Sequence, residues 1–420
     1  MKSKIIKNVT FEDVWQRLSV AEKNLCCTRS HSLDGWQSFI AWNPVNLYSG
    51  KSTRDFKNFV GKEQIKGNRV FGYLSYDIGY SLFNIEPHAQ NDLKLPEIFF
   101  YSFNKYIRFI EDGIEVVATN EKVLENYLVS IKNLLARSLT SQASTVETNS
   151  ELIPNTSKEA YSKSYRKIKS YITEGDIYQI NLTHRLEGTT KKTARQLFLD
   201  MSDKNKVDYI AYVEGNDFEI LSASPERFIK ISSDRIIETF PIKGTRPRGK
   251  TPEEDEVLKN DLMNSPKEAA ELNMITDLLR NDLGKISEIG SVKVVGSRIV
   301  HPYATVWHTY SQIIGKVSKS YTSVDALLSM FPGGSITGCP KKRAMEIIDE
   351  LEPTTRGVYT GCIGFIDPDN SLDFNIAIRT FIKKEDRVYL QVGGGIVYDS
   401  NEKDEYQETF DKAKSFLGII

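Results

Sequence analysis

The sequence has no excess of either charge and only four cysteines. Its 55 basic and 56 acidic residues leave a net charge of −1, so no electrostatic argument points to nucleic acid or an anionic membrane. Any substrate must therefore be recognised by a local arrangement of side chains. Cys26, Cys27, Cys339 and Cys362 lack metal-site spacing, and an adjacent pair is a poor disulfide candidate. This cysteine usage predicts a reducing compartment and implies no sulfur chemistry.

Long apolar runs are also missing. The chain begins Met1-Lys2-Ser3-Lys4 and reaches Asn8, Glu12 and Asp13 before the apolar core of a signal peptide develops. No stretch approaches the roughly 18 consecutive apolar residues that a membrane span requires. We therefore expect a cytoplasmic protein.

The composition that is present is that of an ordinary globular protein, 40% hydrophobic and 26% charged. A length of 420 residues allows two or three average domains, or one large interlocked α/β core. Residues 138–157 are rich in Ser and Thr and poor in apolar side chains, which predicts a linker or a long surface loop. The main boundary is placed there, between an N-terminal region, 1–137, and a larger C-terminal region, 158–420.

Strands and helices can be anticipated on both sides of that boundary. Residues 24–30 and 35–44 suggest two short strands across a polar turn, and the aromatic-rich runs Val70–Tyr80 and Ile98–Ile110 predict further strands. After the boundary, a capping box at 156–159 opens a helix that Gly175 can close.

Residues 241–249 read Pro-Ile-Lys-Gly-Thr-Arg-Pro-Arg-Gly and are the most informative stretch of the chain. Two prolines and two glycines fix the backbone beside a lysine and two arginines, which predicts a rigid loop that faces an anion. A lysine held near other cations and away from water binds its proton less tightly and becomes a nucleophile, so Lys243 is a candidate. The alternative is a basic turn exposed to solvent between a strand and a helix.

Two further polar residues stand beside predicted strands. Residues 176–186 alternate as a strand and place Gln179 on its polar face, where an ordinary surface role is the alternative. Glu226 follows Pro225, and a carboxyl held away from water at such a bend could stay protonated as a general acid. It could equally form a salt bridge with Arg227.

Two helices carry carboxylates in suggestive positions. The first is predicted from the Ser265 cap to Gly284, with Glu268 completing a capping box, and its apolar arc includes Glu271. Because Glu271 has no such capping role, a metal or cation explains it better. The last helix places Glu405, Glu408 and Lys412 on one face. That face is either a solvated stripe or, with the first helix, part of a Mg²⁺ site.

Glycine-rich segments mark two places where the backbone can approach a ligand. Residues 331–338, Phe-Pro-Gly-Gly-Ser-Ile-Thr-Gly, lead into a helix, and such a helix start attracts anions. Cys339-Pro340 replaces the Lys-Ser/Thr pair of a P-loop. Residues 372–382 alternate as one strand with Arg379 on the polar side, and Gly393–Gly395 is predicted to interrupt the following strand.

Taken together, these motifs resemble the chorismate-utilising enzymes, the family of anthranilate synthase component I, aminodeoxychorismate synthase component I, isochorismate synthase and salicylate synthase. The resemblance runs from about Glu159 to the C-terminus and is specific, because its motifs occur in order. A weaker resemblance in the N-terminal third rests on Phe71–Asp77. There Leu25-Cys26-Cys27-Thr28 lacks the glutamate of the tryptophan-feedback motif, so tryptophan binding is not implied. The motifs of the stronger part are Ser224–Glu226, Pro241–Gly249, Glu268–Asp282, Gly333–Lys341, Asp349–Pro353, Gly393–Asp399 and Glu405–Lys412.

The resemblance implies an α+β fold, an anthranilate-synthase-like sandwich of large, mainly antiparallel sheets with helices outside. It also implies roles for the matching residues. Glu226 would protonate the departing 4-hydroxyl group of chorismate, with His308 near the ring. Glu271 and Glu408 would hold Mg²⁺ against the ring carboxylate, with Glu268 and Glu405 behind them or bridging through water. Substrate contacts would come from Thr245, Ser335, Tyr359, Arg379, Gly393, Gly394, Gly395 and Lys412.

Two positions of the resemblance separate its branches. Members that add water carry a lysine where this chain has Gln179, so the resemblance argues against isochorismate or salicylate as product. Anthranilate synthases usually have alanine at the position of Lys243, whereas Pro-Ile-Lys-Gly-Thr is typical of the branch that forms 4-amino-4-deoxychorismate. The alternatives are anthranilate synthesis and a non-catalytic chorismate-binding subunit.

The resemblance also implies a partner that supplies nitrogen. No cysteine of this chain lies in a Gly-x-Cys-x-Gly setting, so the chain offers no glutaminase site of its own. Ammonia would then come from a separate glutamine amidotransferase subunit.

Overall fold

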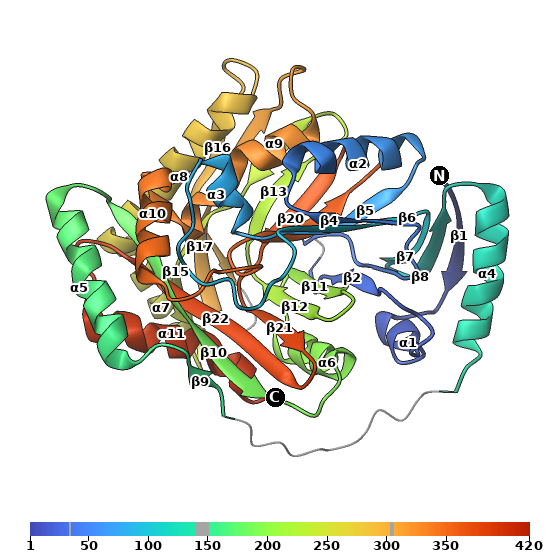
Figure 1. Cartoon of the computed structure of the whole chain (residues 1–420), viewed down its shortest axis with the longest axis horizontal. Helices are drawn as coiled ribbons and strands as arrows, with labels where there is room; N and C mark the ends of the chain where they lie inside the picture. Colours follow the sequence, from blue (N-terminus) through green and yellow to red (C-terminus); the bar gives the residue numbers. More distant parts are fainter. Residues whose placement is uncertain (33–34, 139–150, 303–305) are drawn as a thin grey trace.

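Two large antiparallel sheets pack face to face with helices outside, which confirms the expected sandwich (Figure 1). The computed structural model describes residues 1–32, 35–138, 151–302 and 306–420. One sheet has twelve strands and the other ten. Neighbouring strands within each sheet run antiparallel.

The twelve-stranded sheet draws on the whole length of the chain. Its strands are β1 (Lys2–Lys7), β2 (Cys26–Arg29), β3 (Phe39–Ala41), β7 (Lys105–Ile110), β8 (Gly113–Ala118), β9 (Ile153–Pro154), β10 (Gln179–Thr189), β11 (Tyr209–Glu214), β12 (Glu219–Ser224), β18 (Gly338–Cys339), β21 (Thr380–Lys384) and β22 (Arg387–Ile396). They lie in the order β1-β8-β7-β3-β2-β11-β12-β21-β22-β10-β18, with β9 beside β10.

The ten-stranded sheet is built in the same way. Its strands are β4 (Asn46–Gly50), β5 (Arg69–Leu74), β6 (Ile98–Phe103), β13 (Arg227–Ile231), β14 (Ile236–Thr239), β15 (Ile242–Pro247), β16 (Lys293–Pro302), β17 (Val306–Lys316), β19 (Cys362–Ile366) and β20 (Leu372–Ile376). Their order is β15-β17-β14-β13-β20-β19-β5-β6-β4, with β16 beside β17. Residues on both sides of the predicted boundary therefore contribute strands to both sheets.

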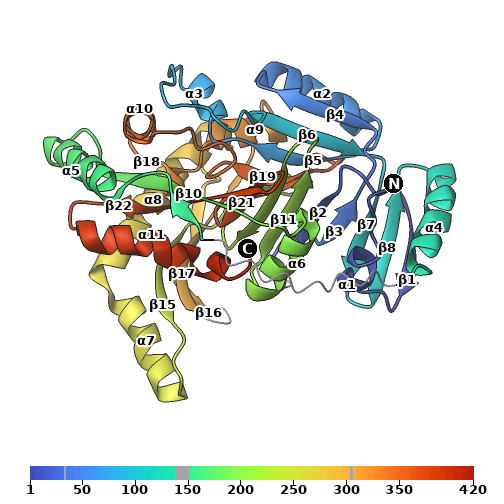
Figure 2. The ribbon, with the colours of Figure 1, turned by 60° about the horizontal axis from the view of Figure 1, so that its bottom comes forward.

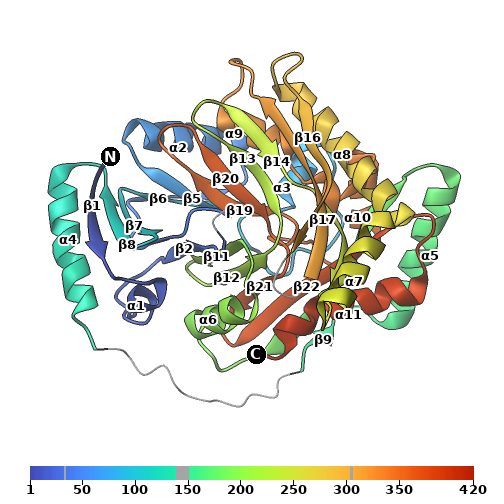
Figure 3. The ribbon, with the colours of Figure 1, turned by 180° about the vertical axis from the view of Figure 1, so that it is seen from behind.

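The helices cover the outer faces of the two sheets (Figures 1 and 3). They are α1 (Phe11–Trp15), α2 (Thr53–Ile65), α3 (Ile78–Leu82), α4 (Glu121–Leu135), α5 (Lys158–Glu174), α6 (Ala194–Lys204), α7 (Pro252–Asn264), α8 (Pro266–Ile286), α9 (Ser323–Met330), α10 (Lys341–Leu351) and α11 (Glu402–Leu417), with the short 3₁₀ turn η1 (Gly334–Ile336). In the described ranges, no helix combines the length and the hydrophobicity that a membrane span needs.

Hydrophobic residues form three layers because successive strand residues face opposite sides of a sheet. On β5, for example, Phe71 and Tyr73 belong to the cluster between the two sheets, whereas Val70 and Leu74 belong to the cluster beneath α2, α8, α9 and α10. A third cluster lies between the twelve-stranded sheet and α1, α4, α6 and α11.

Two chain segments cross between the sheets side by side, and this crossing creates the end of the sandwich described below. The chain passes from β12 to β13 through Pro225 and Glu226, and from β20 to β21 through residues 377–379. The amide of Ile376 donates to the carbonyl oxygen of Glu226 at 3.0 Å, and the amide of Ala223 donates to that of Arg379 at 3.0 Å. The prediction of one strand over 372–382 was wrong, because Arg379 has a left-handed φ of 52° at the crossing.

Local predictions hold better than predictions of how far an element extends. Gly175 closes α5 in the left-handed conformation, as predicted, and β2 pairs with β3. The start of α5 differs by one residue, because Ser157 is the N-cap and accepts from the Ala160 amide, so the capping box predicted over 156–159 does not form. Gly284 does not end α8, which continues to Ile286 with Ser287 as its C-cap.

Three strand boundaries also differ. The strand over 70–80 ends at Leu74 and is followed by α3. The run 98–110 forms β6 and β7, which belong to different sheets. The predicted strand over 176–186 is β10, which starts at Gln179.

The predicted linker is described only at its two ends. Residues 139–150 lie outside the described residues. Beyond them Ile153 and Pro154 form β9, which pairs with Glu187 and Leu186 of β10. The last part of the predicted linker therefore belongs to the twelve-stranded sheet.

Candidate active site

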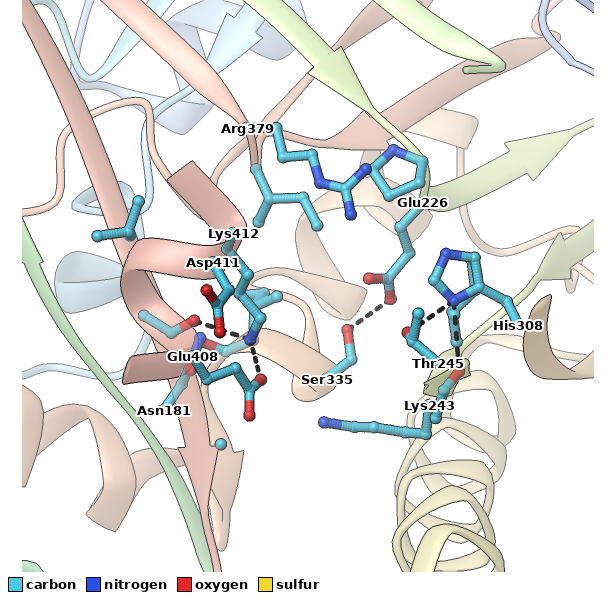
Figure 4. Close-up of a pocket in the computed structure, with 18 of the residues that line it drawn as sticks. Asn181, Glu226, Lys243, Thr245, His308, Ser335, Arg379, Glu408, Asp411 and Lys412 are labelled. Carbon is cyan, nitrogen blue, oxygen red and sulfur yellow. Dashed lines mark hydrogen bonds and ion pairs between the residues drawn. The ribbon is translucent and has the colours of Figure 1, made fainter. Parts of the chain in front are cut away.

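A cavity of about 600 Å³ lies where β10 and β22 of one sheet meet β15, β17 and helices α8 and α11 (Figure 4). Its walls hold all but two of the predicted site residues: Glu226, Lys243, Thr245, Glu268, Glu271, His308, Ser335, Tyr359, Arg379, Gly393, Gly395, Glu405, Glu408 and Lys412. The other two, Gln179 and Gly394, border the same wall. Segments that are far apart in the sequence thus line the same cavity.

Lys243 stands on a strand, so the prediction of a loop over 241–249 was wrong. The stretch forms β15, an edge strand that pairs with β17 and projects from the body with α7 (Figure 2). A bulge at Gly244, with φ of 81°, shifts the register between Lys243 and Thr245. Such a conformation suits glycine because a Cβ there would lie 2.9 Å from Leu262 Cδ1. The bulge lets Lys243 and Thr245 both line the cavity.

Both arginines of this stretch form ion pairs with acidic residues of α7, contrary to the expectation that they act on Lys243. Arg248 pairs with Asp255 at 2.6 Å, and Arg246 pairs with Asp261 at 2.6 Å. The charge of Lys243 instead acts on three cavity carboxyls, those of Glu226, Glu271 and Glu408. Its amine extends into the cavity from the wall opposite Glu408 (Figure 4).

Glu226 has the properties expected of a general acid. Glu226 is buried, with 6% of its surface exposed. Burial raises the pKa of Glu226 to about 7, although a hydrogen bond from Ser335 and the charge of Lys243 lower it. The Ser335 hydroxyl donates to Glu226 Oε1 at 2.8 Å. Arg227, the alternative partner, binds Asp373 at 3.1 Å on the other side of the crossing.

Four glutamates from two helices gather at the opposite end of the cavity. Burial raises the pKa of Glu271, and Glu268 and Glu408 raise it further, against the charges of Lys243 and Lys267. Burial likewise raises the pKa of Glu405, although Ser400 donates to its carboxylate at 2.6 Å. Carboxylates of the two helices therefore act on one another's charge rather than forming a purely solvated stripe.

Glu408 differs from Glu271 and Glu405 in that its pKa is lowered rather than raised. Burial acts to raise its pKa, but the Lys412 ion pair at 2.6 Å and the charges of Lys243 and Lys267 outweigh burial and lower the pKa. Lys412 also donates to the carbonyl oxygen of Gly393 at 3.0 Å. This pair joins α11 to the glycine-bearing part of β22.

These carboxylates fit a hard divalent cation. Burial is the largest cause of the raised pKa of Glu271, and the charges of Glu268 and Glu408 add to it, so a bound cation would stabilise the charged carboxylates. Across the described residues, no group of three or more His, Cys, Asp or Glu side chains converges as a preformed metal site. That finding is compatible with Mg²⁺, which commonly takes one or two carboxylates and completes its shell with waters and a substrate anion.

The prediction that Gly393–Gly395 interrupts its strand was wrong. These residues lie within β22 and pair with β10. A Cβ at Gly394 would lie 3.2 Å from Glu405 Oε2, and one at Gly395 would lie 3.6 Å from Lys243 Nζ. The glycines thus allow α11 and Lys243 to approach the strand from its two sides.

Gln179 is not an ordinary surface residue of β10. It is 1% exposed, and its Oε1 has no hydrogen-bond partner in the described part of the chain. Its Nε2 would lie 2.9 Å from a Cβ at Gly395, beside the amine of Lys243. A buried acceptor without a partner is costly, so it marks a position where a ligand can donate a hydrogen bond.

The remaining predicted residues line the walls between these two ends. His308 Nδ1 lies 2.9 Å from Thr245 Oγ1. Burial lowers the pKa of His308 to about 4, so its imidazole is neutral near pH 7. Burial raises the pKa of Tyr359, which therefore stays protonated. Arg379 enters from the second crossing, next to Glu226 (Figure 4).

The glycine-rich segment 331–338 contributes to the site through the turn η1 rather than through the start of helix α10. Ser335 and Ile336 of η1 line the cavity. Lys341, the first residue of α10, is buried in an ion pair with Asp282 at 2.9 Å. Asp282 shares a helix with Glu271, but Lys341 neutralises it away from the cavity.

Sequence reasoning missed several residues that line the cavity. Lys267 lies in the first turn of α8 and acts on the charges of Glu271, Glu405 and Glu408. Its position directly before Glu268 was the available signal. Asn181 lies two residues after Gln179 on β10 and also lines the cavity. Arg246, Gln391 and Asp411 also contribute to the walls.

A polar cavity with a carboxyl whose pKa is about 7, a lysine amine and several carboxylates is typical of an enzyme that acts on a small anionic molecule. A family model described as chorismate binding enzyme matches residues 26–418. The chain belongs to this family.

Named relatives agree with that assignment. The chain is 36% identical over 389 residues to aminodeoxychorismate synthase component 1 of Bacillus subtilis (strain 168), covering 90% of this chain and 81% of the relative. It is 32% identical over 444 aligned positions to anthranilate synthase component 1 of Acetivibrio thermocellus, covering 99% and 89%. The crystal structure of anthranilate synthase component I from Streptococcus pneumoniae TIGR4 superposes with a TM-score of 0.84 at 28% identity, covering 99% of this chain and all of that one.

Proposed function

We propose that this enzyme converts chorismate and ammonia to 4-amino-4-deoxychorismate. The main support for this proposal is that Lys243 and Glu226 face one cavity from different walls (Figure 4). Four further glutamates, from α8 and α11, line the same cavity. An amine and a protonated carboxyl on either side of a substrate can add a nucleophile while a hydroxyl group departs. Relatives named aminodeoxychorismate synthase component 1 support this choice.

In the proposed reaction the Lys243 amine attacks C2 of chorismate with its lone pair. The two ring double bonds shift, and the C4–O bond breaks as Glu226 donates its proton, so the hydroxyl group leaves as water. Ammonia then attacks C4, the double bonds shift back, and the C2–N bond to Lys243 breaks. A proton of the new ammonium group on C4 returns to the Glu226 carboxylate and restores the acid. The new amine thus replaces the hydroxyl group at its own carbon.

Glu271 and Glu408 would hold Mg²⁺, with Glu268 and Glu405 beside them. The cation would supply positive charge that neutralises and orients the ring carboxylate of chorismate. Arg379, Tyr359, Lys412 and the backbone of Gly393–Gly395 would bind the second carboxylate. The unpartnered Oε1 of Gln179 would accept a hydrogen bond from ammonia beside Lys243.

Anthranilate synthesis is the second candidate, because anthranilate synthases are among the relatives and supply the matching crystal structure. It predicts a different product from the same cavity. Incubation of the purified chain with chorismate, Mg²⁺ and ammonium, followed by mass spectrometry, separates the two. We expect aminodeoxychorismate with its enolpyruvyl group retained; fluorescent anthranilate with release of pyruvate would contradict the proposal.

The proposal includes a partner amidotransferase that delivers ammonia from glutamine. We therefore expect the purified chain alone to work with ammonium salts at raised pH, where more of the ammonia is unprotonated, and to fail with glutamine. Addition of a glutamine amidotransferase subunit should restore glutamine-dependent synthesis. Glutamine-driven product formation by the verified single chain would reveal a second active site.

The raised pKa of Glu226 predicts the pH dependence of turnover. With a pKa of about 7, the carboxyl carries its proton below pH 7 and loses it above, so kcat should fall as pH rises through 7. The free NH₃ concentration must be held constant across the series. Glu226→Gln should lower kcat by roughly 10²–10⁴-fold and abolish the fall of kcat through pH 7. If kcat of Glu226→Gln still falls through pH 7 as in the wild type, the titrating group is not Glu226.

A further inference from the structure

Behind the cavity wall, Arg356 and Glu352 form an ion pair that solvent does not reach. Their side chains are 0% and 2% exposed. Arg356 donates from Nε to Glu352 Oε2 at 2.9 Å and from Nη2 to Glu352 Oε1 at 2.7 Å. Removing two charges from water is costly, and an apolar pair often folds equally well, so stability alone is a weak reason for this arrangement.

Besides a hydrogen bond from Arg356 Nη1 to the Thr360 hydroxyl at 3.4 Å, the pair makes three hydrogen bonds to the backbone of β10 and η1. Arg356 Nη1 donates to the carbonyl oxygen of Ile336 at 3.0 Å, and Nη2 donates to that of Asn181 at 2.7 Å. Glu352 Oε1 accepts from the amide of Thr183 at 2.9 Å. Asn181 and Ile336 both line the cavity. One guanidinium group therefore clamps β10 to the turn η1, and its planar fork fixes their relative position.

Turn η1 is also the element that holds Glu226. Ser335 directly precedes Ile336, and its hydroxyl donates to Glu226 Oε1 at 2.8 Å. A displacement of the Ile336 carbonyl group would therefore move the Ser335 hydroxyl away from the carboxyl.

We propose that Arg356 and Glu352 are positioning residues that hold Ser335 against Glu226 and so place the proton donor for the reaction. This inference rests on the proposed function, in which Glu226 is the acid. The pair contacts neither substrate nor Glu226 itself and acts through η1. An amine at position 356 would keep the charge but lose the fork that reaches both walls.

The direction of the expected effect follows from the groups that face Glu226. Ser335 of η1 and Lys243 of β15 both stabilise the charged carboxylate and lower its pKa. Arg379 lies next to Glu226 from the second crossing and is left unchanged by every variant, while His308 of β17 is neutral near pH 7 (Figure 4). Losing the Ser335 hydrogen bond therefore raises the pKa of Glu226. The fall of kcat with pH should then occur at higher pH than in the wild type.

The test compares Arg356→Lys, Glu352→Gln, Ser335→Ala and the double variant Ser335→Ala/Arg356→Lys in the full chain. The titration of Glu226 is read from its carboxyl infrared band, assigned by difference against Glu226→Gln, and kcat and KM for chorismate are measured at constant free NH₃. Each single variant should move the midpoint upward by roughly half a pH unit. Arg356→Lys and Glu352→Gln should also lower kcat about tenfold, with a smaller change in KM.

The double variant should show the same midpoint as Ser335→Ala alone, because both changes break the same hydrogen bond. A matched control is Arg69→Lys, which alters another buried arginine, 2% exposed and bound to Asp367 at 2.6 Å and 2.8 Å. It should lower the melting temperature and leave the Glu226 midpoint unchanged.

Two results would overturn the positioning role. The first is that Ser335→Ala moves the midpoint of the Glu226 titration while folded Arg356→Lys or Glu352→Gln leaves that midpoint unchanged. The other is an additive shift in the double variant. The infrared midpoint does not require turnover, so failure of the proposed function is distinguishable. A wild type with an infrared midpoint near pH 7 but no fall in kcat there would reject Glu226 as the acid and leave the positioning inference standing.

Discussion

Lys243→Ala is expected to abolish a covalent adduct between the protein and chorismate while leaving chorismate binding nearly intact. The lysine is assigned to the bond-forming step, whereas the carboxylates of the substrate are held by other residues. At low ammonia, kcat should fall on the order of a hundredfold or more, because ammonia must then attack without the preceding step at a positioned amine. Rapid quench and intact-protein mass spectrometry detect the adduct in the wild type.

The control for this experiment is Lys250→Ala, an exposed lysine a few residues further along the same segment. It should retain both the adduct and the rate. Because Gly395 and Gln179 lie beside the Lys243 amine, truncation of that side chain leaves space that high ammonia could fill and partly restore turnover. An unchanged rate of aminodeoxychorismate formation by Lys243→Ala at low ammonia would refute the nucleophile role.

Glu408→Gln should remove nearly all turnover, by roughly a thousandfold or more, with the fold intact. The substitution replaces a charged oxygen ligand of a hard cation by a neutral amide. It also removes the partner of Lys412, which bridges α11 to Gly393. Mg²⁺ titrations of activity, together with Mg²⁺-dependent shifts of melting temperature in the presence of chorismate, should both lose their response.

Asp404→Asn provides the comparison, because Asp404 is an exposed acidic residue one turn earlier on the same helix. It carries the same loss of charge and should keep the Mg²⁺ response. Circular dichroism verifies that both variants are folded. Turnover that survives both Glu408→Gln and EDTA would refute the assignment of these carboxylates to a cation.

The sequence was most informative where structure depends on neighbouring residues. The caps Ser157 and Ser265 and the left-handed Gly175 define helix ends through local hydrogen bonds and backbone angles. The capping box proposed for Glu268 formed only in part: Ser265 accepts from the Glu268 amide, while the Glu268 carboxylate meets Arg246 at 3.4 Å. The side chain that could cap the helix is instead held at the cavity.

Strand limits were harder to predict, because they depend on distant partners. Residues 372–382 alternate as one strand, but the chain changes sheets at Arg379, and a period of two continues across such a crossing. Residues 241–249 contain turn-forming prolines and glycines, yet they pair as an edge strand with β17. Pairing with a strand some sixty residues later overrides the local preference for a turn.

By itself the sequence determined the family, the chemical groups available to the site and the helices that carry the glutamates. The tertiary structure alone decided how those groups are used. It paired Arg246 and Arg248 with Asp261 and Asp255, and it buried Glu226 until its pKa reached about 7. It also paired Asp282 with Lys341 while leaving Glu271 at the cavity. Motifs and caps are written in neighbouring residues, whereas burial and charge pairing depend on which distant segments the two sheets bring together.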